Sequence, residues 1–173
     1  VSRFPLIYLD ETILAHTNLA EFHKFLQEKE NEALLDRMVI VKVPYTLSYV
    51  EESRIYNKLV SAAPAFRDVH LDPHALHVAA VFSVLTRLAE SEAEGDGTKK
   101  ARLYAGEDVD GVSGTEVNKI RARNPEEGLA GVSPRFVINA LSSAIIQSAK
   151  SSLTTMDVLI ALKNAIESDV RID

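Results

Sequence analysis

The stretch that decides the fold is ETILAHTN at residues 11–18, together with NEALLDR at residues 31–37. In the first part, an apolar run ends in the small polar residue Asn18. In the second part, Arg37 stands directly before another apolar run, residues 38–43. The order of strand, polar tip, helix, arginine and strand is typical of an open α/β sheet, in which ligands bind beyond the carboxyl ends of the strands. Asn18 and Arg37 are therefore candidates for contact with a phosphate group.

Length and composition describe one medium-sized globular domain or two small ones. The chain has 173 residues, of which 46% are hydrophobic and 25% charged, so a buried core is expected. Its net charge of -6 argues against a general affinity for nucleic acid. The absence of cysteine excludes disulfides and thiolate zinc sites and favours a cytoplasmic protein. Neither a membrane span nor a signal peptide is visible, and the start at Val1 indicates a piece of a longer protein.

The first third of the chain is expected to be α/β, because two β-branched apolar runs alternate with segments of helical periodicity. In chain order, the predicted elements are a strand over residues 8–16, a helix over 19–29, a helical turn over 32–36, a strand over 38–43 and a helix from Ser48 to Pro64. The last helix begins with the capping box Ser48-x-x-Glu51.

The remaining two thirds are expected to be helical. Three helices begin with capping signals, which are Asp72-Pro73 for a helix over residues 73–90, Ser133-Pro134 and Thr154-x-x-Asp157. An acidic, glycine-containing insertion is predicted at about residues 91–131, with a small basic helix that begins at Ser113. The chain is therefore divided into an α/β part at residues 1–64 and a helical part at residues 65–173.

Asn18 and Arg37 each have a structural alternative. The Asn18 amide can hold a water molecule or a phosphate oxygen, but it also suits the N-cap of the helix that follows, and the two roles are compatible. The planar fork of Arg37 suits a phosphate, and the alternative is a surface ion pair with Asp36 or another carboxylate.

Arg135 follows Ser133-Pro134 and so lies in the first turn of a helix. Free N–H groups and the helix dipole favour an anion there, and an arginine strengthens that preference. Gly128 and Gly131, just before the helix, are expected to leave the approach open and flexible. The alternative is an arginine that points into solvent.

Two weaker patterns are discounted. Residues 106–113 have the glycine spacing of a P-loop but carry Val112 where lysine is required. His70, His74 and His77 lack a convincing carboxylate partner, so no metal site is predicted.

Four strings carry a resemblance to a known family, namely ILAHTN at 13–18, NEALLDR at 31–37, VPY at 43–45 and GVSPRF at 131–136. Over nearly its whole length the chain resembles the bacterial PrkA family of serine protein kinases, which contain an AAA+ ATPase module. The resemblance implies that Asn18 matches the sensor 1 residue and Arg37 the arginine-finger region. It also implies that Arg135 matches the sensor 2 arginine of the helical lid.

The resemblance also implies an architecture and an activity. The Walker A and B motifs and the kinase-like C-terminal part of the family are expected outside this chain. What remains is a partial AAA+ core of a few parallel strands plus a helical lid, inactive by itself. The parent protein is expected to bind ATP and Mg²⁺ and to phosphorylate serine or threonine of a protein substrate. It would form a ring-like homo-oligomer, with neither nucleic acid nor a membrane as partner.

Two alternatives of a different class stay open. One is a mechanical AAA+ ATPase that remodels proteins or feeds proteolysis. The other is a non-enzymatic interaction module.

Overall fold

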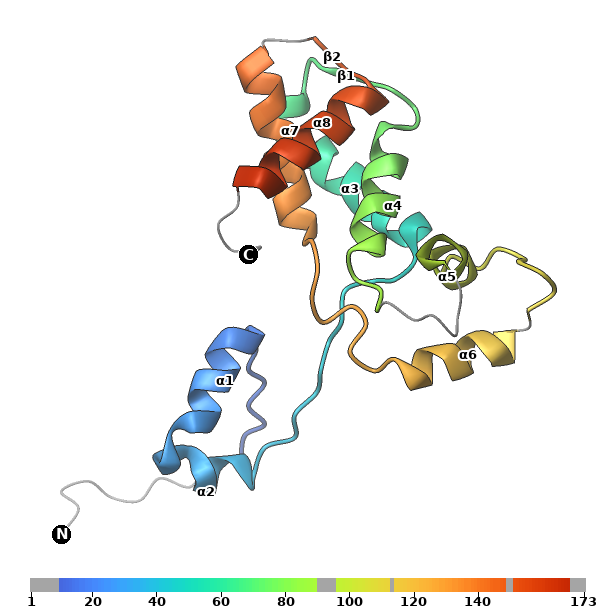
Figure 1. The fold of residues 1–173 in the computed structure, drawn as a ribbon. Coiled ribbons are helices and arrows are strands. Elements are labelled where there is room, and N and C mark those ends of the chain that lie inside the picture. The colour runs from blue at the N-terminus through green and yellow to red at the C-terminus, as the bar shows by residue number, and fades with distance from the viewer. Residues whose placement is uncertain (1–9, 90–95, 113, 149–150, 169–173) are drawn as a thin grey trace, which may run out of the picture. The chain divides into compact units, whose positions relative to one another are not determined.

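The computed structural model describes residues 10–89, 96–112, 114–148 and 151–168 (Figure 1). The chain divides into two units, Val1–Val41 and Lys42–Asp173. Most of the contacts and the whole buried core belong to the second unit. No helix in the described part of the chain combines the length and the apolar character needed to cross a membrane.

The first unit contains the helices α1 (Leu19–Gln27) and α2 (Glu32–Leu35), joined by the 3-10 turn Lys29–Asn31. Asn18 is the N-cap of α1, because its side-chain oxygen accepts a hydrogen bond from the backbone N–H of Glu21 at 2.8 Å. Both predicted helices are thus confirmed, although neither buries a residue among those described.

The two strands predicted in the first third are wrong for the residues that the structure describes. Residues 10–16 and 38–43 form neither helix nor strand, while residues 8 and 9 lie outside the described part. Their apolar side chains are exposed, with Leu14 at 93% and Val39 at 91%. A strand is held by hydrogen bonds to a neighbouring strand, and none of the described residues provides one for these two segments. The apolar pattern of these two segments indicates strand propensity, but the described residues include no strand that pairs with them.

The second unit is mainly helical. Its helices are α3 (Tyr49–Ala62), the 3-10 turn Pro64–Phe66, α4 (Ala75–Leu85), α5 (Gly97–Tyr104), α6 (Gly114–Arg123), α7 (Pro134–Ser148) and α8 (Thr155–Ser168). Two short strands, β1 (His70–Leu71) and β2 (Ser152–Leu153), pair in parallel. The described fold is therefore mostly helical with one small parallel sheet.

The capping signals in the sequence mark where these helices begin. Ser48 accepts from the N–H of Glu51, and Thr154 and Asp157 cap each other's backbone N–H at 3.0 and 3.2 Å. Asp72 accepts from the N–H of His74 at 3.0 Å, and the helix predicted over residues 73–90 spans Ala75–Leu85. Ser113, the predicted cap of α6, lies outside the described residues.

The main core lies among α3, α4, α7 and α8, with the β1–β2 pair at one end (Figure 1). Apolar residues four positions apart in each helix face this core. Its most deeply buried side chains include Tyr56, Val84, Val137, Leu141, Leu153, Val158 and Leu162.

The predicted insertion has a small core of its own. Three buried side chains form it: Leu103 of α5, Val109 of the loop between α5 and α6, and Ile120 of α6. Partly buried Tyr104, Val112 and Val117 pack against them. Helix α5 was not predicted, because its sequence is dominated by polar residues. The predicted domain boundary after residue 64 stays a prediction.

Candidate functional site

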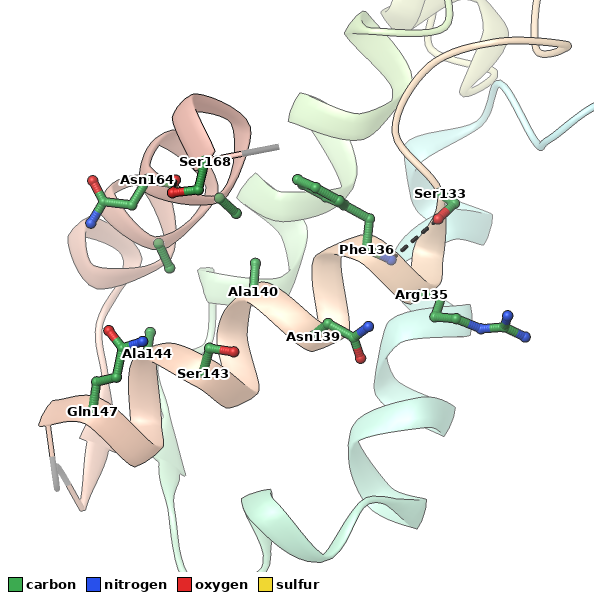
Figure 2. Close-up of a pocket in the computed structure, with 12 residues that line it drawn as sticks. Ser133, Arg135, Phe136, Asn139, Ala140, Ser143, Ala144, Gln147, Asn164 and Ser168 are labelled. Atoms are coloured by element: carbon green, nitrogen blue, oxygen red, sulfur yellow. Dashed lines mark hydrogen bonds between the residues drawn. The ribbon is translucent and has the colours of Figure 1, made fainter. Parts of the chain in front are cut away.

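Arg135 lies in the first turn of α7. Ser133 caps this helix, since its Oγ accepts from the N–H of Phe136 at 3.2 Å. The Arg135 side chain is exposed and extends outward from the helix, away from Phe136 (Figure 2). The predicted position of the arginine is therefore confirmed, and its geometry suits an anion at the start of the helix.

A groove of about 490 Å³ runs between α7 and α8 beside this arginine. Alanines of both helices and Phe136 form its apolar part, while hydroxyl and amide side chains supply hydrogen-bonding groups (Figure 2). The described residues that line it are Ser133, Arg135, Phe136, Asn139, Ala140, Ser143, Ala144, Gln147, Ala161, Asn164, Ala165 and Ser168. Arg135 is the one charged residue in that set, so a polar or anionic ligand suits the groove better than a cation.

Asn18 and Arg37 belong to the first unit. The oxygen of Asn18 is used by the α1 N-cap, which confirms the structural role considered for it. Nη1 of Arg37 donates to the carbonyl oxygen of Ala33 at 2.8 Å, at the C-terminal end of α2, where a cation is favourable. Arg37 thus contacts a backbone carbonyl rather than the carboxylate that was considered. Arg135 lies in the other unit, and the proposed roles of all three residues stay predictions.

A buried arginine that the sequence did not single out lies at the end of α4. Nη2 of Arg87 is 2.5 Å from Oε1 of Glu52 in α3, and these side chains are 0% and 1% exposed. Nε and Nη2 of Arg87 donate to the carbonyl oxygen of Val132 at 3.1 and 2.8 Å. Nη1 donates to the carbonyl oxygen of Thr46 at 2.9 Å, and the guanidinium lies over the Tyr45 ring at 4.8 Å. One side chain therefore joins three separate parts of the second unit.

A second buried ion pair joins α5 to the loop before α7. Nζ of Lys100 in α5 is 2.6 Å from Oε1 of Glu127, with side chains 2% and 1% exposed. Glu127 also accepts from the backbone N–H of Ala89 at 2.9 Å and from the hydroxyl of Tyr104 at 2.7 Å. A buried carboxylate is stable only with such partners. This pair fixes the start of the loop that leads to α7.

Gly128 and Gly131 do not leave the approach to α7 open, and that expectation is wrong. Both have positive φ, +81° and +99°, which glycine adopts without strain. A Cβ at Gly131 would lie 2.6 Å from the carbonyl oxygen of Thr86, and one at Gly128 would lie 2.8 Å from that of Tyr45. The glycines are needed because other backbone segments pack directly against them.

The histidines considered as metal ligands have other surroundings. His70 is in β1, and the ring of His77 packs edge-on against Tyr49 at 5.3 Å. Among the described residues, no group of three or more His, Cys, Asp or Glu side chains is arranged to hold a metal ion. In the loop with P-loop-like spacing, an ion pair with Lys99 at 2.6 Å lowers the pKa of Asp110.

Comparison with known proteins identifies the family. A family model described as the PrkA AAA domain matches residues 1–95, and one described as the PrkA serine protein kinase C-terminal domain matches residues 98–173. The chain belongs to the PrkA family.

Two relatives show how far the similarity extends. The ATP-dependent protease PrkA of Bacillus subtilis (strain 168) is 45% identical over 166 residues, which cover 95% of this chain and 26% of that protein. The serine/threonine kinase YeaG of Escherichia coli (strain K12) is 38% identical over 133 residues, which cover 75% of this chain and 20% of that protein. The chain thus spans about a quarter of the PrkA relative and a fifth of YeaG. No solved structure matches the chain.

The two PrkA matches correct one expectation. The family's C-terminal part was expected outside this chain, yet its model matches residues 98–173. Asn18 and Arg37 fall within the AAA match, whereas Arg135 falls within the C-terminal match. The sensor 2 assignment of Arg135 therefore stays a prediction.

Proposed function

We propose that the PrkA protein of which this chain is a part uses ATP to phosphorylate serine or threonine of a protein substrate. The observation that supports this most directly is the succession of two matches in one chain, an AAA domain followed by a serine protein kinase C-terminal domain. The name of the YeaG relative, a serine/threonine kinase, agrees with it.

The proposed roles follow from what phosphoryl transfer requires, which is mainly positioning and neutralisation of charge. Asn18 would orient the group that attacks the γ-phosphate. Arg37, whose guanidinium is exposed, would reach the γ-phosphate held by a neighbouring subunit, which implies a ring-like homo-oligomer. Arg135 would respond to the γ-phosphate from the start of α7. ATP and Mg²⁺ would be held mainly by residues outside this chain.

A second candidate is ATP-dependent proteolysis, in which the AAA module supplies mechanical work. It is favoured by the PrkA relative, named an ATP-dependent protease, which matches 95% of the chain at 45% identity. Both candidates need ATP turnover, so the fate of the γ-phosphate and of the protein substrate separates them.

The experiment uses the full-length protein, ATP with a radiolabelled γ-phosphate and casein as a generic protein substrate. Label on casein serine or threonine supports the kinase. Free phosphate together with casein fragments supports the protease instead, and free phosphate with intact casein supports a remodelling ATPase. A full-length protein that releases no phosphate and labels nothing overturns the proposal in favour of an interaction module.

A further inference from the structure

Three chain segments meet at the C-terminal end of α4, and we call this meeting point the α4 junction. It consists of residues 44–47 before α3, residues 86–89 after α4 and residues 127–132 before α7 (Figure 1). All three segments belong to the second unit. None of them is part of a regular helix or strand, yet each is bound to the others.

Backbone hydrogen bonds connect the segments in sequence. Tyr45 donates its N–H to the carbonyl oxygen of Gly128 at 2.8 Å, and Gly128 donates its own to that of Arg87 at 3.1 Å. The N–H of Val132 is bound by Oγ1 of Thr86 at 3.0 Å. The loop before α7 is therefore held to the end of α4 at Gly128 and again at Val132, after Gly131.

Arg87 closes the junction from inside. Its fork serves the carbonyl oxygens of Thr46 and Val132 and the carboxylate of Glu52 at the same time. Backbone carbonyls in such a buried position need a donor, and a planar guanidinium supplies several in fixed directions. A lysine ammonium is a point charge and cannot reproduce that geometry.

The contact with Val132 is close to Arg135 along the chain. Ser133 caps α7 through its Oγ, and Pro134 has a fixed φ, so little backbone freedom remains between the two residues. On the other side, Thr46 is followed by buried Leu47 and by Ser48, the N-cap of α3. One guanidinium thus ties the start of α3 to the start of α7.

We infer that Arg87 is a positioning residue that sets the place of the first α7 turn, and with it Arg135, relative to the segment that enters α3. The role of Arg135 in ATP sensing rests on the proposed function. The positioning of the first α7 turn by the α4 junction, which we call the interlock, rests on the contacts of the second unit alone. A purely structural arginine would instead stabilise the whole unit evenly.

The first experiment measures amide hydrogen exchange in the full-length protein. Arg87→Lys should raise exchange by roughly tenfold at Tyr45, Gly128 and Val132 and in the first turn of α7, while α8 keeps its protection. The matched control is Arg54→Lys, which alters an exposed arginine that is also 2.5 Å from a carboxylate. An even rise that includes α8, or no rise at the junction, overturns the inference.

A second variant covers the case in which Arg87→Lys does not fold. Thr86→Val keeps the shape of the side chain and leaves the buried charge in place, but removes the acceptor for Val132. Thr86→Val should raise hydrogen exchange at the same amides, by a smaller factor than Arg87→Lys. If exchange at Val132 and in the first α7 turn stays at the wild-type level, the interlock does not exist.

The second experiment uses the full-length protein and compares its affinities for ATP and ADP. Arg87→Lys and Arg135→Ala should each reduce the preference for ATP, and the double variant should lose no more than Arg135→Ala alone. Additive losses would show that Arg87 does not act through Arg135 and would overturn that part. If the wild-type protein itself has no preference and no turnover, the proposed function fails, and the exchange data still decide the interlock.

Discussion

At the scale of single residues, Tyr56 is the side chain whose titration changes most clearly among the residues that the structure describes. Its hydroxyl donates to Oγ of Ser83 at 2.7 Å, and Ser83 donates on to the carbonyl oxygen of Ala79 at 2.9 Å. Burial raises the pKa of Tyr56 well above its ordinary value of 10.0, and nearby Glu52 adds to the increase, although the bond with Ser83 opposes it. The neutral hydroxyl is thus the form that the folded core accepts.

Tyr56→Phe should lower the free energy of unfolding by about 0.5–1.5 kcal/mol near neutral pH, because one buried hydrogen bond is lost. A raised folded pKa gives stability that is fully present below the unfolded value of 10.0 and is lost as the pH rises above it. Tyr56→Phe lacks the titrating hydroxyl, so the difference in unfolding free energy between the wild type and this variant should be smaller at about pH 11 than near neutral pH. Urea unfolding of both proteins at the two pH values is the measurement, and a deficit that stays constant would contradict the argument.

Arg37 is the residue proposed to act on a neighbouring subunit. In the full-length protein, Arg37→Ala should leave ATP binding nearly unchanged and lower turnover by roughly 10³–10⁵, as for other arginine fingers. Steady-state phosphate release and nucleotide binding are the measurements, with Arg123→Ala, an exposed arginine of α6, as the control. Near-wild-type turnover would mean that Arg37 only binds the end of α2, through the carbonyl oxygen of Ala33.

At the scale of elements, the start of α7 combines a cap, a fixed φ and an exposed cation. Arg135→Ala leaves the Ser133 cap and the buried face of the helix intact, so helix content should not change. In the full-length protein the same change should reduce the preference for ATP over ADP. Arg135→Lys should recover only part of it, because an ammonium lacks the bidentate fork.

Circular dichroism and nucleotide titrations together test that prediction. Wild-type preference and turnover in Arg135→Ala would leave Arg135 as a solvated arginine.

The elements also show which structural information is local in the sequence. Ser48 and Thr154 were identified as caps because their partners are three residues away. Arg87 was not identified, because its partners Glu52 and Val132 are 35 and 45 residues away. The strands predicted over residues 8–16 and 38–43 failed for a related reason, since a strand depends on a neighbour that its own sequence does not specify. Asn18, Arg37 and Arg135 each carry a local signal in the sequence, whereas the α4 junction that holds the start of α7 joins segments far apart along the chain.

At the scale of the whole chain, nucleotide binding should be weak. The sequence contains no P-loop lysine, which together with Mg²⁺ ligands normally supplies most phosphate contacts. Arg135 and the groove beside it offer only one charged group among the described lining residues. Titration calorimetry of this chain with ATP should therefore show no binding at micromolar concentrations. A micromolar dissociation constant would contradict this prediction and would call for a phosphate site within the chain.

The parallel pairing of β1 and β2 has a consequence for folding during synthesis on the ribosome. His70 pairs with Ser152 and Leu71 with Leu153, so β1 has no partner strand until residues 152 and 153 have been synthesised. The side chains that cover α4, including Val158 and Leu162 of α8, are synthesised later still. The apolar faces of α3 and α4 therefore leave the exit tunnel well before their covering helix, and during that interval a chaperone can compete with closure.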